Sequence, residues 1–198
     1  MITFKDLVDE TPYKKFSDYY RKAIENNQIS VEAIAISSFN PLQNQVNSRF
    51  VNLKYIHQDE WIFFSNYKSE KAKEFESFPI ISALIYWNSI NVQIRIKAKI
   101  FKSDHNFSDE HFKKRSNEKN ALAVSSMQSK EISSFKKVKE NYKNVLKNIS
   151  STERPDYWGG YSFIPHYFEF WEGANNRLNK REVFELLDSD WTSYYLQP

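Results

Sequence analysis

The chain has 198 residues, a formal net charge of +3 and no cysteine, which suits one domain with a full core and excludes disulfide or thiolate chemistry. It has no apolar run long enough to cross a membrane and no N-terminal secretory pattern, and its mild basic excess is too weak to indicate nucleic acid. We therefore expect a single domain over residues 1–198 of a cytoplasmic protein, without nucleic-acid or membrane partners.

The first half of the sequence predicts a helix, several short strands and a second helix. The first helix is expected over 12–27, because Pro12 suits a first turn and apolar residues then recur at helical spacing. Apolar and turn-rich stretches next predict a strand, a turn region and the two strands of a hairpin: 33–36, 37–47, 49–55 and 61–65. Ser69 then takes the N-cap position of a helix over 70–77.

The second half predicts further strands and two helical regions. The clearest alternation of apolar and polar residues, over 92–100, predicts a half-buried strand with one polar face. The remaining expected elements are a strand at 80–86, a helix over 108–120, an amphipathic helix over 132–146, a loop over 148–156, and strands at 167–172, 177–187 and 191–196. Together these elements predict an α+β fold, an antiparallel β-barrel with peripheral helices.

Three frequent kinds of site are disfavoured by the sequence. Only three glycines occur, so neither a P-loop nor a dinucleotide-binding fingerprint can be built. A nucleotide-like ligand would have to be held by side chains and by helix or strand amides. The four histidines have no metal-ligand spacing, so we expect no metal, and no nucleophile elbow is present.

A donor-rich segment lies near the C-terminus. If the strand begins at Arg177, then Arg177, Asn179 and Arg181 share one face, because strand side chains alternate. Two guanidiniums and an amide suit a phosphate, a carboxylate or the oxygens of a polar ring, and Trp171 lies just across the preceding turn. A solvated edge strand is the alternative interpretation.

A second candidate is an anion site at the start of the helix 70–77. The free amides there carry partial positive charge, and Lys71 adds a full charge. Arg49 and Lys54 flank the preceding hairpin strand. An ordinary capped helix is the alternative, and Glu70 fits that alternative.

A third candidate is a basic stripe. His111, Arg115 and Lys119 follow one another at intervals of four residues, so on a single helix they would line one face. A solvated basic surface is the alternative here.

Taken together, the clusters fall in the order of one known family. The segments that carry the resemblance are 49–54, 63–66, 69–72, 93–96, 128–129, 157–160 and 169–181. In this order they closely resemble pyridoxamine 5'-phosphate oxidase, from about residue 12 to the C-terminus. The resemblance implies an FMN-binding split β-barrel that acts as a homodimer, with two FMN clefts at the subunit interface. It also implies oxidation of pyridoxine or pyridoxamine 5'-phosphate to pyridoxal 5'-phosphate, with reduction of O2 to H2O2.

The resemblance also implies roles for individual residues. FMN would be held by Arg49, Phe50, Val51, Asn52, Leu53, Phe64, Ser65, Lys71, Gln93, Gln128, Ser129, Trp171 and Arg181. The substrate phosphate would be held by Lys54 and Arg115, with His111 and Lys119 at two further phosphate-binding positions. Arg177 and Asn179 match the catalytic positions over the substrate ring.

Several residues depart from the family pattern. Asn179 stands where the family has histidine, His111 where it usually has tyrosine, Lys119 where it usually has serine, and Glu70 where it usually has arginine. Because three of these positions belong to the substrate site, two other functions remain open. One is oxidation of a different substrate, such as a dihydro-phenazine-type acid in secondary metabolism. The other is flavin binding without turnover.

Overall fold

The computed structural model describes residues 1–149 and 153–198. In chain order the elements are β1 (Thr3–Lys5), α1 (Thr11–Glu25), β2 (Ala33–Asn40), β3 (Gln45–Asn52), β4 (Tyr55–His57), β5 (Glu60–Asn66), α2 (Glu70–Ser77), β6 (Ile80–Trp87), a short 3-10 turn η1 (Asn88–Ile90), β7 (Val92–Lys102), α3 (His105–Lys114), α4 (Asn117–Ser125), α5 (Phe135–Asn148), β8 (Trp158–Glu172), β9 (Lys180–Leu187) and β10 (Asp190–Leu196).

The strands form one curled sheet in the order β1-β4-β5-β8-β7-β6-β2-β3, with β9 on β8 and β10 on β9. Every described pairing is antiparallel except β1 with β4. The α+β prediction is confirmed, and the sheet is open rather than closed, because β1 and β3 are edge strands, as is β10 on the branch through β9.

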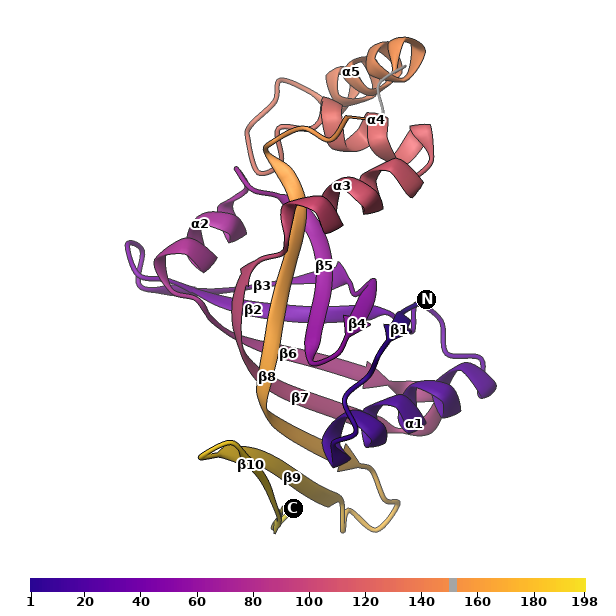
Figure 1. Cartoon of the computed structure of the whole chain (residues 1–198), viewed down its shortest axis with the longest axis vertical. Coiled ribbons are helices and arrows are strands. Elements are labelled where there is room, and N and C mark those ends of the chain that lie inside the picture. The colour runs from indigo at the N-terminus through magenta and orange to yellow at the C-terminus, as the bar shows by residue number, and fades with distance from the viewer. Residues whose placement is uncertain (150–152) are drawn as a thin grey trace.

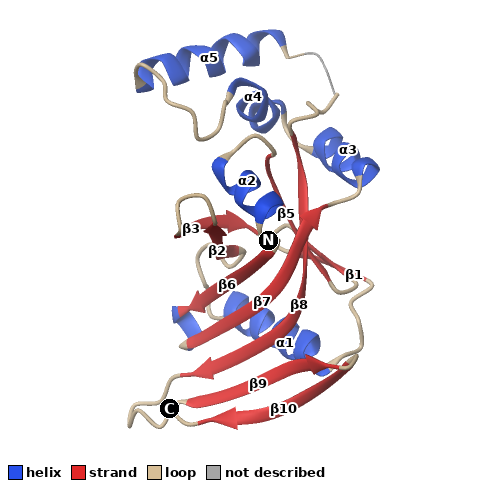
Figure 2. Cartoon of the chain, turned by 90° about the vertical axis from the view of Figure 1, so that its left-hand side faces the viewer, coloured by secondary structure: helices blue, strands red, loops and turns tan. Residues whose placement is uncertain are grey.

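The central strand is β8, which runs along most of the molecule (Figure 1). It pairs with β5 over its first residues, with β7 along most of its length, and with β9 over its last residues. Helices α3, α4 and α5 gather at its N-terminal end, and β9 and β10 lie at the other end (Figure 2). The length of β8 therefore sets the distance between the helices at one end of the molecule and the strands β9 and β10 at the other.

Aromatic rings fill much of the core, as the composition predicts for a β-rich protein. On α1, Phe16 is buried with its ring centroid 4.3 Å from that of Trp61 and 5.5 Å from that of Trp87. The predicted alternation of β7 is confirmed, since Val92, Ile94, Ile96, Ala98 and Ile100 are all buried. The aromatic residues thus join α1 to the sheet by apolar contact.

The predicted hairpin of 49–55 with 61–65 is wrong. Residues 45–52 pair instead with β2, and only Tyr55–His57 pairs with β5. The predicted turn region 37–47 shrinks to the few residues after Asn40, whose side-chain oxygen accepts from the backbone amides of Leu42 and Gln43. This Asx turn lets β2 and β3 extend into what the sequence indicated as loop.

The single helix predicted over 108–120 is also wrong, because α3 ends at Lys114 and α4 begins at Asn117. Ser116 starts the second helix, where its hydroxyl accepts from the amide of Lys119 at 3.5 Å. A serine N-cap therefore divides the segment.

Sequence patterning found only the second half of β8. The first half, from Trp158, is buried on both faces, so it lacks alternation, and it contains Gly159, Gly160 and Pro165, which are residue types that disfavour a strand. At Gly159 a Cβ would lie 2.2 Å from the hydroxyl oxygen of Tyr67, which explains why this strand position has no side chain. The short β1 was not predicted. The predicted loop 148–156 is only partly described, since Asn148 ends α5 and 150–152 lie outside the described residues.

Among the described residues, no helix combines the length and apolarity needed to span a membrane.

The aromatic core leads to a stability prediction. Phe168 is fully buried and contacts the rings of Tyr13, Trp61, Phe170 and Trp191. Phe168→Ala should lower the free energy of unfolding by about 3–5 kcal/mol, measured by urea denaturation at fixed protein concentration. Leu42→Ala is the control, since Leu42 is 94% exposed and its change should stay within about 0.5 kcal/mol. Equal losses would contradict this description of the core.

Candidate active site

The candidate site residues fall into two groups at opposite ends of β8. Phe64 lies opposite Gly160 near the start of β8, whereas Gln93 and Arg181 both lie opposite Trp171 near its end. The strand between Gly160 and Trp171 is up to about 35 Å long at 3.3 Å per residue. The helix-end group comprises Arg49, Lys54, Phe64, Ser65, Lys71, His111, Arg115, Lys119 and Gln128. The turn-end group comprises Gln93, Trp171, Arg177, Asn179 and Arg181.

In the helix-end group, Lys71 is buried at the start of α2. Its ammonium donates to the hydroxyl of Ser65 at 3.3 Å and to that of Ser69 at 3.4 Å. Ser69 holds the N-cap position, as predicted, but its side chain makes no cap hydrogen bond. Burial and the nearby charge of Arg49 lower the pKa of Lys71. Two cations that converge in this way would be stabilised by an anion.

Arg49 lies beside Lys71 and is held by a buried carboxylate. Its guanidinium is 2.8 Å from Glu74 on α2, which also accepts from Asn47 at 2.7 Å and from Ser38. Burial alone would raise the pKa of Glu74, but these hydrogen bonds, with the charge of Arg49, lower it. Sequence reasoning missed Glu74, although it shares the buried face of α2 with Lys71. The carboxylate fixes the guanidinium and balances its charge.

A cavity of about 240 Å³ opens beside these residues, lined in part by Phe64, Ser65, Arg115, Gln128 and Trp158. The hydroxyl of Ser65 donates to the side-chain oxygen of Gln128 at 3.2 Å. The helix-end side chains of β5 and the segment after α4 therefore meet at one hollow.

Arg115 reaches this cavity with one nitrogen unpaired. Its guanidinium lies 4.3 Å from the ring centroid of Trp158, and Nη2 donates to the carbonyl of Lys119 at 2.9 Å. Nη1 is buried and has no hydrogen-bond partner within residues 1–149 and 153–198, and burial lowers the pKa of Arg115 to about 10. Leaving a charged donor unpaired is costly, so an acceptor bound in the cavity would be stabilised here.

His111 lies flat against Phe64, with 3.7 Å between ring centroids and 10° between ring planes. Its Nδ1 is 2.9 Å from the hydroxyl oxygen of Tyr55. Burial, aided by the charges of Arg115, Lys54, Lys114 and Lys119, lowers the pKa of His111 to about 4. The imidazole is therefore neutral near pH 7.

The prediction that the basic stripe lies on one helix is wrong, but its three side chains still lie near one another. Arg115 follows the end of α3 in extended backbone and Lys119 belongs to α4, so the three residues do not share a helix. The chain turn at Ser116 nevertheless brings Arg115 onto the carbonyl of Lys119. Lys54 is also nearby, with its ammonium 3.9 Å from Glu32.

At the turn end, Gln93, Trp171 and Arg181 stand in one cross-strand row on β7, β8 and β9. Nε and Nη2 of Arg181 are each 2.8 Å from one oxygen of Glu169, and Nη1 of Arg95 is 2.7 Å from the other. Glu169 is buried, so this pair of arginines is held by a carboxylate that sequence reasoning missed. Nη1 of Arg181 also donates to the carbonyl of Gln197 at 3.0 Å.

The shared strand face predicted for Arg177, Asn179 and Arg181 is wrong. The strand β9 begins at Lys180, and Arg177 adopts a left-handed conformation with φ of 63° in the preceding turn. The side-chain oxygen of Asn179 accepts from the amide of Ala174 at 3.0 Å, which closes this turn. Arg177 is exposed at the turn, so the turn and not a strand face presents it.

Four of the remaining predicted FMN residues, Phe50 to Leu53, lie on the edge strand β3 or directly after it, and the fifth is Ser129. Phe50 is 75% exposed, Val51 is half-buried and Asn52 is exposed, whereas Leu53 is fully buried and its amide donates to the carbonyl of Glu32. Ser129 is exposed after α4, with a positive φ of 69°. The structure does not bring these residues into one hydrogen-bonded cluster with Lys71.

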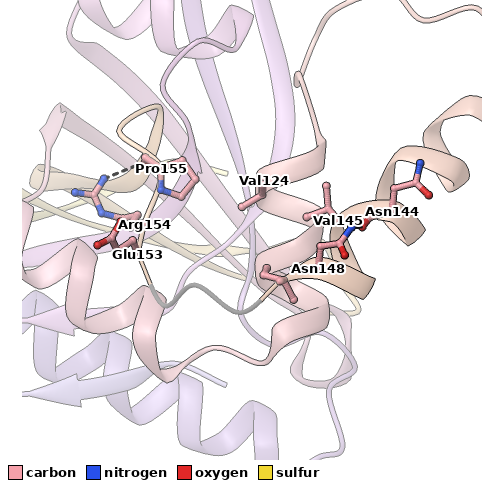
Figure 3. A pocket seen from close by; sticks show the side chains of 8 residues that line it. Val124, Asn144, Val145, Asn148, Glu153, Arg154 and Pro155 are labelled. Atoms are coloured by element: carbon pink, nitrogen blue, oxygen red, sulfur yellow. Dashed lines mark hydrogen bonds between the residues drawn. The ribbon is translucent and has the colours of Figure 1, made fainter.

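A larger cavity lies behind the helix-end group, between α4, α5 and the segment before β8 (Figure 3). Its lining is mainly apolar and amide, including Val124, Asn144, Val145 and Asn148. Arg154, which also lines it, is committed to Asp109 at 2.7 Å. Within 1–149 and 153–198, no three histidine or acidic side chains converge as metal ligands.

Comparison with known proteins gives one consistent result. Residues 158–198 match the family described as "Pyridoxine 5'-phosphate oxidase C-terminal dimerisation region". The pyridoxine/pyridoxamine 5'-phosphate oxidase of Rippkaea orientalis is 32% identical over 98% of this chain and 92% of its own length. The pyridoxine/pyridoxamine 5'-phosphate oxidase 2 of Hydrogenovibrio crunogenus is 31% identical over 96% of this chain and 90% of its own length.

Two solved structures share the fold. PhzG from Burkholderia lata 383, in complex with tetrahydrophenazine-1-carboxylic acid, has a TM-score of 0.90 at 24% identity and covers 98% of this chain and 99% of its own. A pyridoxamine 5'-phosphate oxidase-related, FMN binding protein from Nostoc punctiforme has a TM-score of 0.78 at 12% identity, covering 96% and 99%. At these sequence identities the two structures show a shared fold and nothing more. That fold is the split barrel that the sequence predicted.

The environment of His111 leads to a titration prediction. Because its folded pKa of about 4 lies below the ordinary value near 6.5, the unfolded chain binds more protons between these values. Stability contributed by neutral His111 is therefore present above about pH 6.5 and is lost as the pH falls toward 4. In an NMR titration, the chemical shifts of the His111 ring protons should change only near pH 4. The His111 signals are assigned by their loss in His111→Gln. A midpoint near 6.5 would contradict the burial described above.

Proposed function

The chain belongs to the pyridoxine/pyridoxamine 5'-phosphate oxidase family, and we propose that it is an FMN-dependent oxidase of a B6 phosphate. In this proposal a cytoplasmic, single-domain chain forms a homodimer and transfers a hydride from pyridoxine or pyridoxamine 5'-phosphate to FMN. Reoxidation by O2 then gives H2O2. The proposal is consistent with the family match and with the donor chemistry of both groups of site residues.

The observation that carries the proposal is the separation of the two groups. A ligand the size of FMN cannot touch Lys71 at one end of β8 and Arg181 at the other end of the same strand, if β8 keeps its length. Two-fold pairing of two chains would place the helix-end group of one chain against the turn-end group of its partner. Each dimer would then hold two composite sites.

An exposed apolar sheet face supports the pairing. Ile80, Leu84 and Tyr86 project from β6, and Val46 and Phe50 project from the neighbouring β2–β3 hairpin, all to solvent. Ala35 on β2 lies between Phe50 and Leu84 in the cross-strand register. Apolar residues gathered in this way favour association, and a second copy of this chain is the partner that the two half-sites need.

The helix-end residues suit the phosphate of FMN. Lys71 and Arg49 would provide the charge, with the amides at the start of α2, and Ser65 and Gln128 would provide further hydrogen bonds. The partner's turn-end row of Gln93, Trp171 and Arg181 would offer an amide, an apolar ring and a guanidinium to the flavin ring. When bound, the flavin supplies the hydride acceptor, so the protein needs no nucleophile of its own.

The remaining helix-end residues suit the anionic group of the substrate. Lys54, Arg115 and Lys119 would supply the charge, and Nη1 of Arg115, which has no hydrogen-bond partner among the described residues, would donate to such a group. Arg177 and Asn179, on the turn from the partner, would lie over the substrate ring and orient it. Asn179 would also help to hold Arg177 in position, because its side-chain oxygen closes the turn that contains Arg177.

A second candidate function is oxidation of a different cyclic acid. It is favoured by the neutral His111 and by Asn179, whose side chain is engaged with the amide of Ala174. A monoanionic carboxylate requires fewer cationic donors than a phosphate. The PhzG structure named above holds such an acid, a precedent within the same fold.

The proposal predicts a yellow protein that makes peroxide. The purified protein should show a flavin absorbance spectrum and release H2O2 with pyridoxine 5'-phosphate. Arg49→Ala should weaken FMN binding by at least about tenfold, because a charge-assisted contact to the phosphate is lost, whereas Asn179→Ala should change FMN binding little. Thermal melts check that both variants fold. Bound FMN without turnover on B6 phosphates would leave the second candidate, and inability to bind FMN would overturn both.

Composite sites predict complementation between two defective chains. Lys71→Met damages the helix-end half and Arg177→Ala the turn-end half, so each homodimer should be nearly inactive. Random mixing of equal amounts, by co-expression with two tags, gives mixed dimers in which one site has both halves intact. Activity should then recover to about a quarter of the wild-type value. No recovery in purified mixed dimers would indicate that each site lies within one chain.

A further inference from the structure

One contact at the edge of the helix-end group takes no part in the proposed chemistry: the hydrogen bond between Tyr55 and His111. Tyr55 opens β4 and lies opposite Ile62 on β5, so its ring reaches Phe64, two residues along that strand. It packs edge-on against Phe64, Phe107 and His111, with ring centroids 6.2, 5.2 and 5.4 Å away. The phenol is thus held by three rings while its hydroxyl oxygen is 2.9 Å from Nδ1 of His111.

This contact determines which imidazole nitrogen carries the proton. A neutral imidazole has one N–H donor and one bare acceptor nitrogen. The phenol O–H is a good donor, whereas its oxygen is a weak acceptor because its lone pair is delocalised into the ring. The favoured arrangement therefore has Tyr55 donating to Nδ1, which leaves the proton on Nε2.

The surroundings of His111 suit such a donor. Its ring is clamped against Phe64, which lines the same cavity as Arg115 and Trp158. The charges that act on His111 come from Arg115, Lys54, Lys114 and Lys119, and Lys114 is the last residue of α3. Among the described residues no hydrogen bond engages Nε2, so this N–H is available to a ligand. An N–H within a ring of cations contributes direction to anion binding without adding a charge.

We propose that Tyr55 is a positioning residue that holds His111 with its proton on Nε2, as a donor to the anionic group of the substrate. This rests on the proposed function for the identity of the substrate, but the tautomer itself does not. Tyr55 would act only through His111, while Lys54, Arg115 and Lys119 supply the charge. Tyr55 and His111 are 56 residues apart in sequence. Of the two, His111 stands at a position where the family usually has tyrosine.

The tautomer can be measured without turnover. Long-range ¹H–¹⁵N correlation spectra of the full-length protein should give His111 the Nε2–H pattern at pH 7. Tyr55→Phe keeps the ring packing and removes only the hydroxyl, so the same spectra should show a mixture of tautomers. Tyr142→Phe, on the remote α5, is the matched control and should leave the pattern unchanged. A wild-type Nδ1–H pattern, or no change in Tyr55→Phe, would overturn the proposal whatever the enzyme activity.

The role in binding is tested with the B6 phosphates and with inorganic phosphate as a competing ligand. Tyr55→Phe should raise KM for pyridoxine 5'-phosphate and the inhibition constant of phosphate by about 5- to 20-fold, with a smaller change in kcat. His111→Gln keeps an N–H near the position of Nε2 without needing Tyr55. In that background Tyr55→Phe should have little further effect, which a merely structural tyrosine would not produce.

The outcomes separate the two proposals. If no B6 phosphate is oxidised but Tyr55→Phe still shifts the tautomer and weakens phosphate binding, the proposed substrate fails and the role of Tyr55 stands. If turnover occurs but Tyr55→Phe leaves KM and phosphate binding unchanged, the proposed function stands and the role of Tyr55 fails. Equal effects of Tyr55→Phe with histidine or glutamine at position 111 would also overturn it.

Discussion

The ladder of hydrogen bonds along β8 is the constraint on which the rest of the structure depends. One strand of 15 residues pairs in turn with β5, β7 and β9, so its register fixes Phe64 at one end and Gln93 with Arg181 at the other. Because backbone hydrogen bonds set this spacing, side-chain changes cannot bring the two groups together within a chain. In the proposed function, assembly of two chains would complete each site.

Buried carboxylates organise the charge of both half-sites. Glu74 holds Arg49 beside Lys71, and Glu169 holds both Arg95 and Arg181, the latter directly opposite Trp171. A long arginine side chain has many rotamers, and fixing it before a ligand arrives removes part of the entropy cost of binding. The arrangement also lowers the net positive charge, so each half-site is less repulsive in the separate chain. The carboxylates therefore allow a stable fold to contain these clusters of cations.

The sequence predicted elements whose side chains report their own environment. The alternation of β7 and the Ser69–Pro79 boundaries of α2 are local signals, and both were correct. The first half of β8 was missed because burial on both faces removes alternation, and the Arg177 turn because an asparagine side chain closes it from five residues away. Glu74 and Tyr55 act on Arg49 and His111 only after the chain has folded. The resemblance predicts candidate site residues, but only the tertiary contacts reveal which side chains hold them in place.

The central place of β8 also has a consequence for how the chain is made. Gly160 must pair with Phe64, which leaves the ribosome almost a hundred residues earlier, and β7 must likewise wait for its partner. Until the last part of the chain emerges, β5 and β7 expose unpaired edges next to apolar side chains, a state prone to misassociation. Folding of the sheet is consequently a late, long-range event during synthesis. The same C-terminal segment then both completes the sheet of its own chain and carries every turn-end residue except Gln93.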